Sequence, residues 1–243
     1  MNTPVSDHYE RLLGPVYSWM SGDLDAATSH ADQELTAIGL PLTASGLAVD
    51  LGAGFGRHSL PLARRGYRVL AVDGCEPLLQ ELKSRAGGLE VRTVRGDLLD
   101  FRAHVGETAD VILCMGDTIT HLPDMSSVES LFTAVAASLR PGGLFAITFR
   151  DYASTELQGD GRFIPVRADE NRILTCFLEY AGETVRVHDV LHERLADGWH
   201  VRVSSYPKLR LTAASVVRSL TSLGFSVRRE TGLSGMVRVV AQL

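Results

Sequence analysis

From residue 47 to residue 149 the sequence alternates between short apolar runs and amphipathic segments of helical period. The apolar runs are 47–51, 67–72, 91–94, 111–115 and 144–149, and the predicted helices between them are 57–65, 76–86 and 126–139. A run that is apolar at every position is typical of a strand buried on both faces. Strands and helices that alternate at this rhythm form right-handed βαβ units, so the sequence predicts a doubly wound, mostly parallel α/β sheet.

Three other parts of the chain depart from that rhythm. Residues 7–38 have helical spacing and predict one to three short helices ahead of the first strand. Residues 162–206 alternate with a period of two, which predicts three or four antiparallel strands. After a predicted helix over 213–223, strands 225–229 and 236–241 are too close in sequence for a crossover and should pair antiparallel.

Together these patterns predict a seven-stranded sheet with an antiparallel C-terminal hairpin. We expect a single domain over residues 1–243. Its expected parts are an N-terminal helical cap (1–40), a ligand-binding core (45–150 and 212–243) and a small inserted antiparallel sheet (160–210).

Composition excludes several classes of function. The net charge is −5 and the basic residues are scattered arginines, with Lys83 and Lys208 as the only lysines, so no basic face for nucleic acid is predicted. The three cysteines are far apart without a CxxC pair, so we expect no metal site. No apolar stretch reaches the roughly 18 residues that a bilayer requires. The start of the chain lacks the pattern of a signal peptide, and we expect a cytoplasmic protein with no membrane contact.

A glycine cluster follows the first predicted strand, in the sequence VDLGAGFG of residues 49–56. Glycines at such a turn let the backbone bend sharply and let a ligand approach without meeting a Cβ. The helix that follows offers free N–H groups that favour an anionic group. A dinucleotide fingerprint would place a third glycine where this chain has Arg57, and a bulky arginine fits poorly there.

Acidic residues end the next two predicted strands. Asp73 lies 21 residues after Gly52, where a carboxylate can accept both hydroxyls of a ribose. Asp97 follows Gly96 at the end of the third strand, where it can accept from an exocyclic amine. Taken singly, each aspartate could equally be a helix N-cap. All these features lie at the carboxyl ends of strands, the edge at which open α/β sheets bind ligands.

Taken in order, these motifs resemble those of the class I S-adenosylmethionine-dependent methyltransferases. The resemblance covers about residues 45–150 and 212–243 and includes the DVILCMGD segment (110–117), the LRPGG segment (139–143) and the closing hairpin. It implies S-adenosylmethionine as methyl donor. The cofactor-binding residues that it implies are Asp50, Gly52, Ala53, Gly54, Arg57, His58, Asp73, Gly74, Asp97, Leu98, Cys114, Met115, Gly116 and Asp117.

The resemblance also implies roles for these residues. The glycine turn would pass beside the methionine portion, with Asp50 orienting its amino group. Asp73 would hold the ribose, and Asp97 with the Leu98 backbone would hold the adenine. Residues 114–117 would line the methionine side near the sulfonium. Arg57 or His58 would meet the cofactor carboxylate, with a surface position at the helix start as the equal alternative.

The residues that bind the methyl acceptor are harder to predict from the sequence. Candidate catalytic residues are His121, Arg150 and Tyr152, which follow the fourth and fifth strands. Tyr9, Tyr17 and Trp19 could also line the acceptor, although a packed amphipathic stripe is the favoured interpretation for them. The sequence lacks the Asn-Pro-Pro-Tyr and Pro-Cys motifs of nucleic-acid methyltransferases.

The expected reaction is therefore methyl transfer to an N or O atom of a small-molecule acceptor, by a monomer or homodimer. One alternative is a non-catalytic protein that binds S-adenosylmethionine or S-adenosylhomocysteine. A nicotinamide-dependent oxidoreductase is a further alternative, disfavoured by Arg57 and by the closing hairpin.

Overall fold

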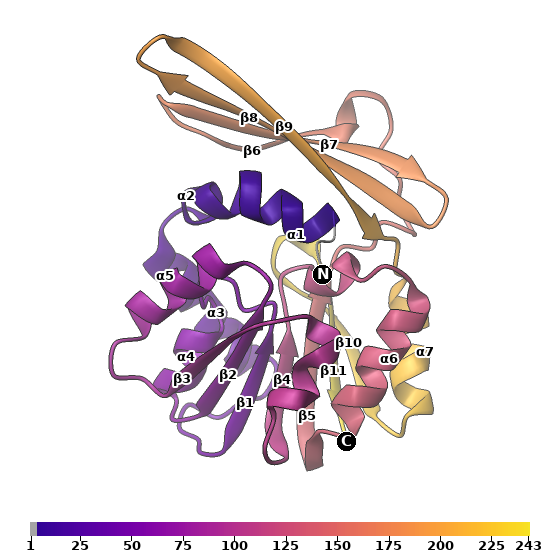
Figure 1. The fold of residues 1–243 in the computed structure, drawn as a ribbon. Coiled ribbons are helices and arrows are strands. Elements are labelled where there is room, and N and C mark those ends of the chain that lie inside the picture. Colours follow the sequence, from indigo (N-terminus) through magenta and orange to yellow (C-terminus); the bar gives the residue numbers. More distant parts are fainter. Residues whose placement is uncertain (1–3) are drawn as a thin grey trace.

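A computed structural model describes residues 4–243 and contains two separate β-sheets (Figure 1). The larger sheet has seven strands in the order β10-β11-β5-β4-β1-β2-β3. Its strands are β1 (Leu47–Leu51), β2 (Arg68–Asp73), β3 (Val91–Arg95), β4 (Ala109–Cys114), β5 (Leu139–Phe149), β10 (Ser226–Thr231) and β11 (Val237–Gln242). The first five pair in parallel, and β11 pairs antiparallel with both β5 and β10. The predicted mostly parallel sheet and its antiparallel hairpin are confirmed.

Helices cover both faces of this sheet, as a sheet that is apolar on both sides requires. The helices are α3 (Leu24–Ala37), α4 (Ser59–Arg64), α5 (Glu76–Ala86), α6 (Met125–Ala136) and α7 (Ala213–Ser222). Along β1, Val49 and Leu51 join the apolar cluster that contains α6 and α7. Ala48 joins the cluster on the opposite face, with α3, α4 and α5. None of the helices within residues 4–243 is long and apolar enough to cross a membrane.

The N-terminal segment runs between the two sheets (Figure 1). It consists of α1 (Pro4–His8), a π-helical turn (Tyr9–Leu13), a 3₁₀ turn (Gly14–Val16) and α2 (Tyr17–Ser21). Its buried residues Leu12, Leu13 and Val16 pack against Leu174 and Leu191 of the second sheet. The segment is too short and broken to be stable alone, so these contacts fix its position.

The second sheet is inserted between β5 and α7. It has four antiparallel strands in sequence order, β6 (Phe163–Ala168), β7 (Arg172–Ala181), β8 (Thr184–Leu195) and β9 (Gly198–Leu209). The period of two is confirmed, because Val185, Val187 and Leu191 are buried on the face toward the N-terminal segment. On the outer face Val201 and Val203 remain 55% and 61% exposed.

Some element boundaries differ from the prediction. The fifth strand begins at Leu139, five residues early, because Leu139 already pairs with Ala109 before the pairing shifts to Leu144 and Val111. The glycine turn at residues 140–143 is therefore an irregularity inside a strand. A 3₁₀ helix, η3 (Leu98–His104), was not predicted, since seven residues are too few to show a helical period.

Candidate functional site

The glycine turn after β1 lies against the loop after β4. Gly52 has φ +75° and Gly54 has φ +53°, a region that favours glycine. A Cβ at Gly52 would lie 2.3 Å from Cγ2 of Thr118, in the loop that follows β4. Only glycine lets these two loops approach so closely, so the turn brings the carboxyl ends of β1 and β4 together.

Asp73 at the end of β2 stabilises this glycine turn through a hydrogen bond. Its Oδ2 accepts a hydrogen bond from the backbone N–H of Gly54 at 2.8 Å, and its Oδ1 accepts one from Cys75 at 2.8 Å. Burial among protein atoms raises the pKa of Asp73 above its usual value, which these hydrogen bonds partly offset. The side chain is only half-buried. Each carboxylate oxygen keeps a second lone pair, which suits the hydroxyls of a ribose.

Three glycines at this edge of the sheet have open space beside them. A Cβ built at Gly74 or at Gly116 would meet nothing within 4 Å, and one at Gly54 would meet only Cδ1 of Leu78 at 3.9 Å. These glycines come from the loops after β2, β4 and β1. Bare backbone with open space beside it, next to the carboxylate of Asp73, leaves room for a bound ligand at these turns.

Three of the predicted cofactor residues are engaged by other side chains. Asp50 is buried, and its Oδ2 accepts from the hydroxyl of Ser59 at 2.6 Å. Arg57 and His58 both contact Oε2 of Glu34 on α3, at 3.1 and 3.3 Å. These pairs join β1 and α4 to each other and to the N-terminal helices, and direct contact of the three residues with the cofactor stays a prediction.

Of the remaining predicted cofactor residues, Ala53 is buried in the turn after β1, and the others follow β3 or lie at the end of β4. Asp97 is exposed and caps η3 by accepting from the N–H of Leu99 at 2.9 Å, and Leu98 beside it is half-buried. Cys114 and Met115 are buried at the end of β4. Burial raises the pKa of the Cys114 thiol, so this side chain is a neutral packing group. Their roles toward adenine and methionine stay predictions.

Asp117 is the centre of a buried polar cluster. It has φ 75°, and Lys208 of β9 donates to its Oδ2 at 2.5 Å. The hydroxyl of Tyr152 donates to the same oxygen at 3.1 Å, and the backbone N–H of Arg150 donates to Oδ1 at 2.9 Å. Burial alone would raise the pKa of Asp117, but the Lys208 charge and these hydrogen bonds hold it below its usual value. The predicted residues Asp117, Arg150 and Tyr152 are thus brought together.

His121 lies beside this cluster, at the end of the 3₁₀ turn η4 (Thr118–His121). Its ring stacks on Tyr206 of β9, with centroids 5.4 Å apart and an interplanar angle of 18°. Tyr9 meets it edge-on, and the Tyr9 hydroxyl is 3.5 Å from Nε2. Burial, and then the charge of Lys208, lowers the pKa of His121 to about 3, so the ring is neutral at physiological pH. Within the described chain its buried Nδ1 has no hydrogen-bond partner.

The sequence analysis missed Lys208 and Tyr206 as site residues. Both point to the inner face of β9, where Tyr206 pairs with Val187 and Lys208 with Val185. Two signals were available: Lys208 is one of only two lysines, and the period of two places both residues on the buried face. Neither signal reveals which part of the core that face would cover.

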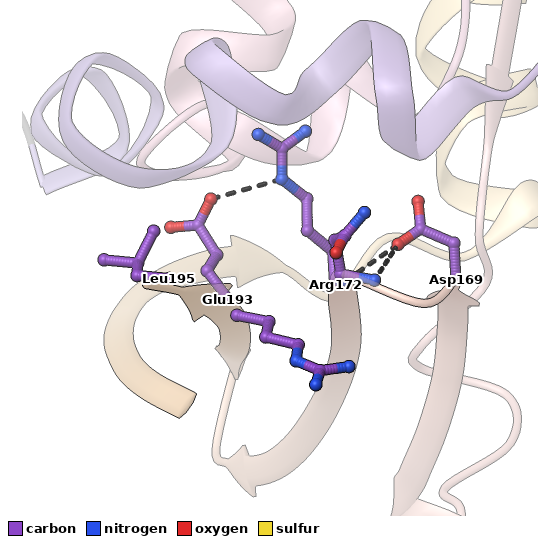
Figure 2. Close-up of a pocket in the computed structure, with 6 residues that line it drawn as sticks. Asp169, Arg172, Glu193 and Leu195 are labelled. Carbon is purple, nitrogen blue, oxygen red and sulfur yellow. Dashed lines mark hydrogen bonds and ion pairs between the residues drawn. The ribbon is translucent and has the colours of Figure 1, made fainter. Parts of the chain in front are cut away.

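A separate cavity of about 270 Å³ lies within the inserted sheet (Figure 2). Its lining residues are Asp169, Asn171, Arg172, Glu193, Arg194 and Leu195. Arg172 and Glu193 form an ion pair at 3.2 Å across it. None of the predicted site residues lines this cavity. Within residues 4–243, no three His, Cys, Asp or Glu side chains cluster so as to hold a metal ion.

Comparison with known proteins shows what this chain is similar to. Residues 48–143 match a family model described as a methyltransferase domain. Solved structures share the fold: an S-adenosylmethionine-dependent methyltransferase from Clostridium acetobutylicum has a TM-score of 0.74 at 15% identity, covering 97% of this chain and 96% of that one. An amino pentose methyltransferase from Micromonospora echinaspora has a TM-score of 0.76 at 19% identity, covering 96% of each chain. Residues 48–143 thus resemble a methyltransferase domain in sequence, and the chain shares the fold of solved S-adenosylmethionine-dependent methyltransferases.

Curated relatives match more locally. A cypemycin N-terminal methyltransferase from a Streptomyces species is 30% identical over 128 residues, 52% of this chain and 51% of that protein. A glycine/sarcosine N-methyltransferase from Aphanothece halophytica is 27% identical over 151 residues, 60% of this chain and 57% of that protein. The chain spans about half the length of the curated relatives it matches.

Proposed function

We propose that this protein transfers a methyl group from S-adenosylmethionine to the nitrogen of a small amine. The observation that carries the proposal is that the proposed donor and acceptor residues lie at the same edge of the larger sheet. There Gly54, Gly74 and Gly116, which have open space beside them, follow β1, β2 and β4, and His121 and Asp117 also follow β4. A donor site and an acceptor site on adjacent loops are what a group transfer between two bound molecules requires.

The chain's residues have distinct proposed tasks on the donor side. When bound, S-adenosylmethionine supplies an electrophilic methyl group on a sulfonium. Asp73 binds the ribose hydroxyls while its hydrogen bond to Gly54 keeps the glycine turn in place. The bare backbone at Gly116 leaves room beside the loop after β4.

The chemistry of His121 favours nitrogen over oxygen as the methylated atom. An alcohol is a poor nucleophile until a base removes its proton, and an effective base has a pKa near the working pH. The pKa of His121 is lowered to about 3, so this ring is too weak a base for an alcohol. A neutral amine needs no such base. His121 can instead accept an N–H hydrogen bond and orient the nitrogen lone pair, and alignment of that kind supplies much of the rate in a displacement.

The names of most curated relatives support the same choice, although two ubiquinone biosynthesis O-methyltransferases, 33% and 34% identical, also match. Of the two relatives described above, one is a cypemycin N-terminal methyltransferase and the other is a glycine/sarcosine N-methyltransferase. One structural neighbour is described as a sugar N-methyltransferase from a Streptoalloteichus species. We infer an amine nitrogen as the acceptor atom, without assigning one compound.

Calorimetry with S-adenosylmethionine, S-adenosylhomocysteine and NAD tests the donor site. We expect micromolar binding of the two sulfur ligands, and loss of that binding in Asp73→Ala. Glu107→Ala is the control, because Glu107 is an exposed carboxylate paired with Arg68. It should bind like the wild type. Binding of NAD alone would contradict the methyltransferase proposal and support the alternative of a nicotinamide-dependent oxidoreductase.

A screen of acceptors tests the reaction. Release of S-adenosylhomocysteine is followed with an amino sugar, glycine and a short peptide, each beside an analogue whose amine is replaced by a hydroxyl. We expect turnover with at least one amine and none with the hydroxyl analogues. Methylation of a hydroxyl would contradict the choice of nitrogen. Tight cofactor binding without turnover of any acceptor would support the non-catalytic alternative.

A further inference from the structure

His8 and Asp189 form a buried pair that the reaction described above does not use. Nε2 of His8 lies 3.0 Å from Oδ2 of Asp189. His8 comes from α1 and Asp189 from β8, so the pair joins the N-terminal segment to the inserted sheet. The His8 side chain is fully buried, and Asp189 is nearly so.

Asp189 is set up to hold the His8 ring in one orientation. It lies in a row of apolar residues on the inner face of β8, between Val187 and Leu191. The facing Cys176 of β7 pairs with it in the sheet and contacts its carboxylate. Burial raises the pKa of the Cys176 thiol to about 12, so the thiol keeps its proton and can donate a hydrogen bond to Asp189. A carboxylate oxygen accepts hydrogen bonds, so the contact suits an Nε2–H of His8 that donates to Asp189.

The His8 ring in turn packs on the ring that supports His121. Its centroid lies 4.3 Å from that of Tyr206, with an interplanar angle of 37°. Tyr206 stacks on His121 at 5.4 Å. Contacts therefore run from Asp189 through His8 and Tyr206 to His121, across three segments far apart in the sequence.

Stability gives no reason for such a pair in this position. A buried ion or imidazole–carboxylate pair is often no more stabilising than well-packed apolar residues of similar volume. Here Nδ1 of His8 is also buried without a hydrogen-bond partner in the part of the chain that is described, which costs free energy. What the pair supplies that an apolar pair would not is a directional bond that fixes the plane of the ring.

We propose that His8 and Asp189 are positioning residues, which hold the Tyr206 ring and through it the orientation of His121 at the acceptor site. The proposal rests on the proposed function for its purpose, because it assigns His121 the task of orienting the acceptor nitrogen. The geometry itself is a property of the protein without acceptor, so it is tested without one.

The test follows the ring resonances of His121 by NMR in protein labelled at histidine, bound to S-adenosylhomocysteine. His121→Gln identifies the resonance. His8→Ala and Asp189→Ala should move or broaden it, because the Tyr206 ring current no longer acts from one fixed position. Asp189→Asn keeps an oxygen acceptor for Nε2 and should restore the wild-type resonance. His200→Ala is the matched control, since it removes an exposed His–Asp pair at 2.7 Å and should change nothing.

A second variant covers the case in which the alanine variants fail to fold. His8→Phe with Asp189→Leu removes both polar groups together, keeps apolar volume and leaves no unpaired charge. We expect it to fold, to bind S-adenosylhomocysteine within about twofold of the wild type and to show a broadened His121 resonance, because the aromatic ring has lost its directional bond.

Kinetics add a readout that a purely structural role would not produce. For an amine methylated in the screen above, we expect the folded variants to lose about tenfold or more in kcat, with the KM for S-adenosylmethionine unchanged. An unchanged His121 resonance in the folded variants would overturn the positioning role, whether or not any amine is methylated. Absence of turnover in the wild type, with the resonance displaced as expected, would overturn the proposed function alone.

Discussion

Nζ of Lys208 lies 2.5 Å from Oδ2 of Asp117, and this contact joins the last strand of the inserted sheet to the turn after β4. Lys208 is 9% exposed, so the pair is shielded from solvent. The same strand carries Tyr206, which stacks on His121. Strand β9 therefore supplies one side of the polar cluster that we propose as the acceptor site, and the inserted sheet is part of that cluster.

Loss of the lysine should be severe. In Lys208→Met the Asp117 carboxylate stays buried without its counter-charge, and removal of one partner of a buried pair typically costs about 3–5 kcal/mol. We expect a loss of that order in the free energy of unfolding, measured by urea denaturation. Lys83→Met is the control, because Lys83 is half-exposed and 3.9 Å from Glu76. A loss below about 1 kcal/mol, the range of exposed pairs, would contradict a tightly coupled pair.

The pair should also respond to acid in a defined direction. The pKa of Asp117 is lowered in the folded protein, so its stabilising effect is complete above the unfolded value of about 4 and is lost as the pH falls through the lower folded value. The double variant Asp117→Asn, Lys208→Met has no carboxylate to titrate at this place. The difference in unfolding free energy between wild type and variant should be constant from pH 7 to 5 and should decrease in favour of the variant below about pH 4. A difference that is flat down to pH 2 would contradict this assignment.

Two glycines with the same backbone conformation should differ in tolerance of a side chain. Gly52 and Gly116 have φ +75° and +77°, so alanine is strained at both, by about 1 kcal/mol. At Gly52 the new Cβ would also lie 2.3 Å from Thr118, whereas at Gly116 it meets nothing within 4 Å. We expect Gly52→Ala to lower the melting temperature clearly more than Gly116→Ala. Equal losses would show that the loops after β1 and β4 are not in contact.

Gly116→Ala should nevertheless impair binding. Its Cβ would enter the open space that we assign to the cofactor. We expect weaker binding of S-adenosylhomocysteine by calorimetry, with little loss of stability beyond the backbone strain. Unchanged affinity would place the cofactor away from the loop after β4.

His121 should not titrate in the physiological range. Its pKa is lowered to about 3 in the folded protein, against about 6.5 in an unfolded chain. The ring resonance of His121 should therefore be constant from pH 8 to 5. Since the unfolded chain takes up this proton first, His121 makes the folded state less stable as the pH falls from about 6.5 toward 3. A resonance with a midpoint near 6.5 would exclude the buried, neutral ring described above.

The strand and helix pattern of the sequence was enough to predict the fold. Apolar runs in β1, β2 and β4, and the period of two in the inserted sheet, follow from local burial and survive in the structure. The sequence also predicted that Gly52, Gly54 and Asp73 would lie close together, since they follow or end strands that are neighbours in the sheet. Features of this kind can be predicted because they depend only on the spacing of residues along the chain.

The acceptor side was decided by tertiary structure. Sequence pointed to His121 and Tyr152 because they follow strands at the binding edge, but it did not connect them with Lys208 or Tyr206, more than 50 residues later. From the sequence, Arg57 and His58 could either contact the cofactor or lie at the surface. In the structure both side chains contact Glu34. Period and motif determine which residues face inward, because they depend on neighbours in the chain. Which inward-facing residues meet depends on how two sheets and the N-terminal segment pack together, and no local pattern contains that.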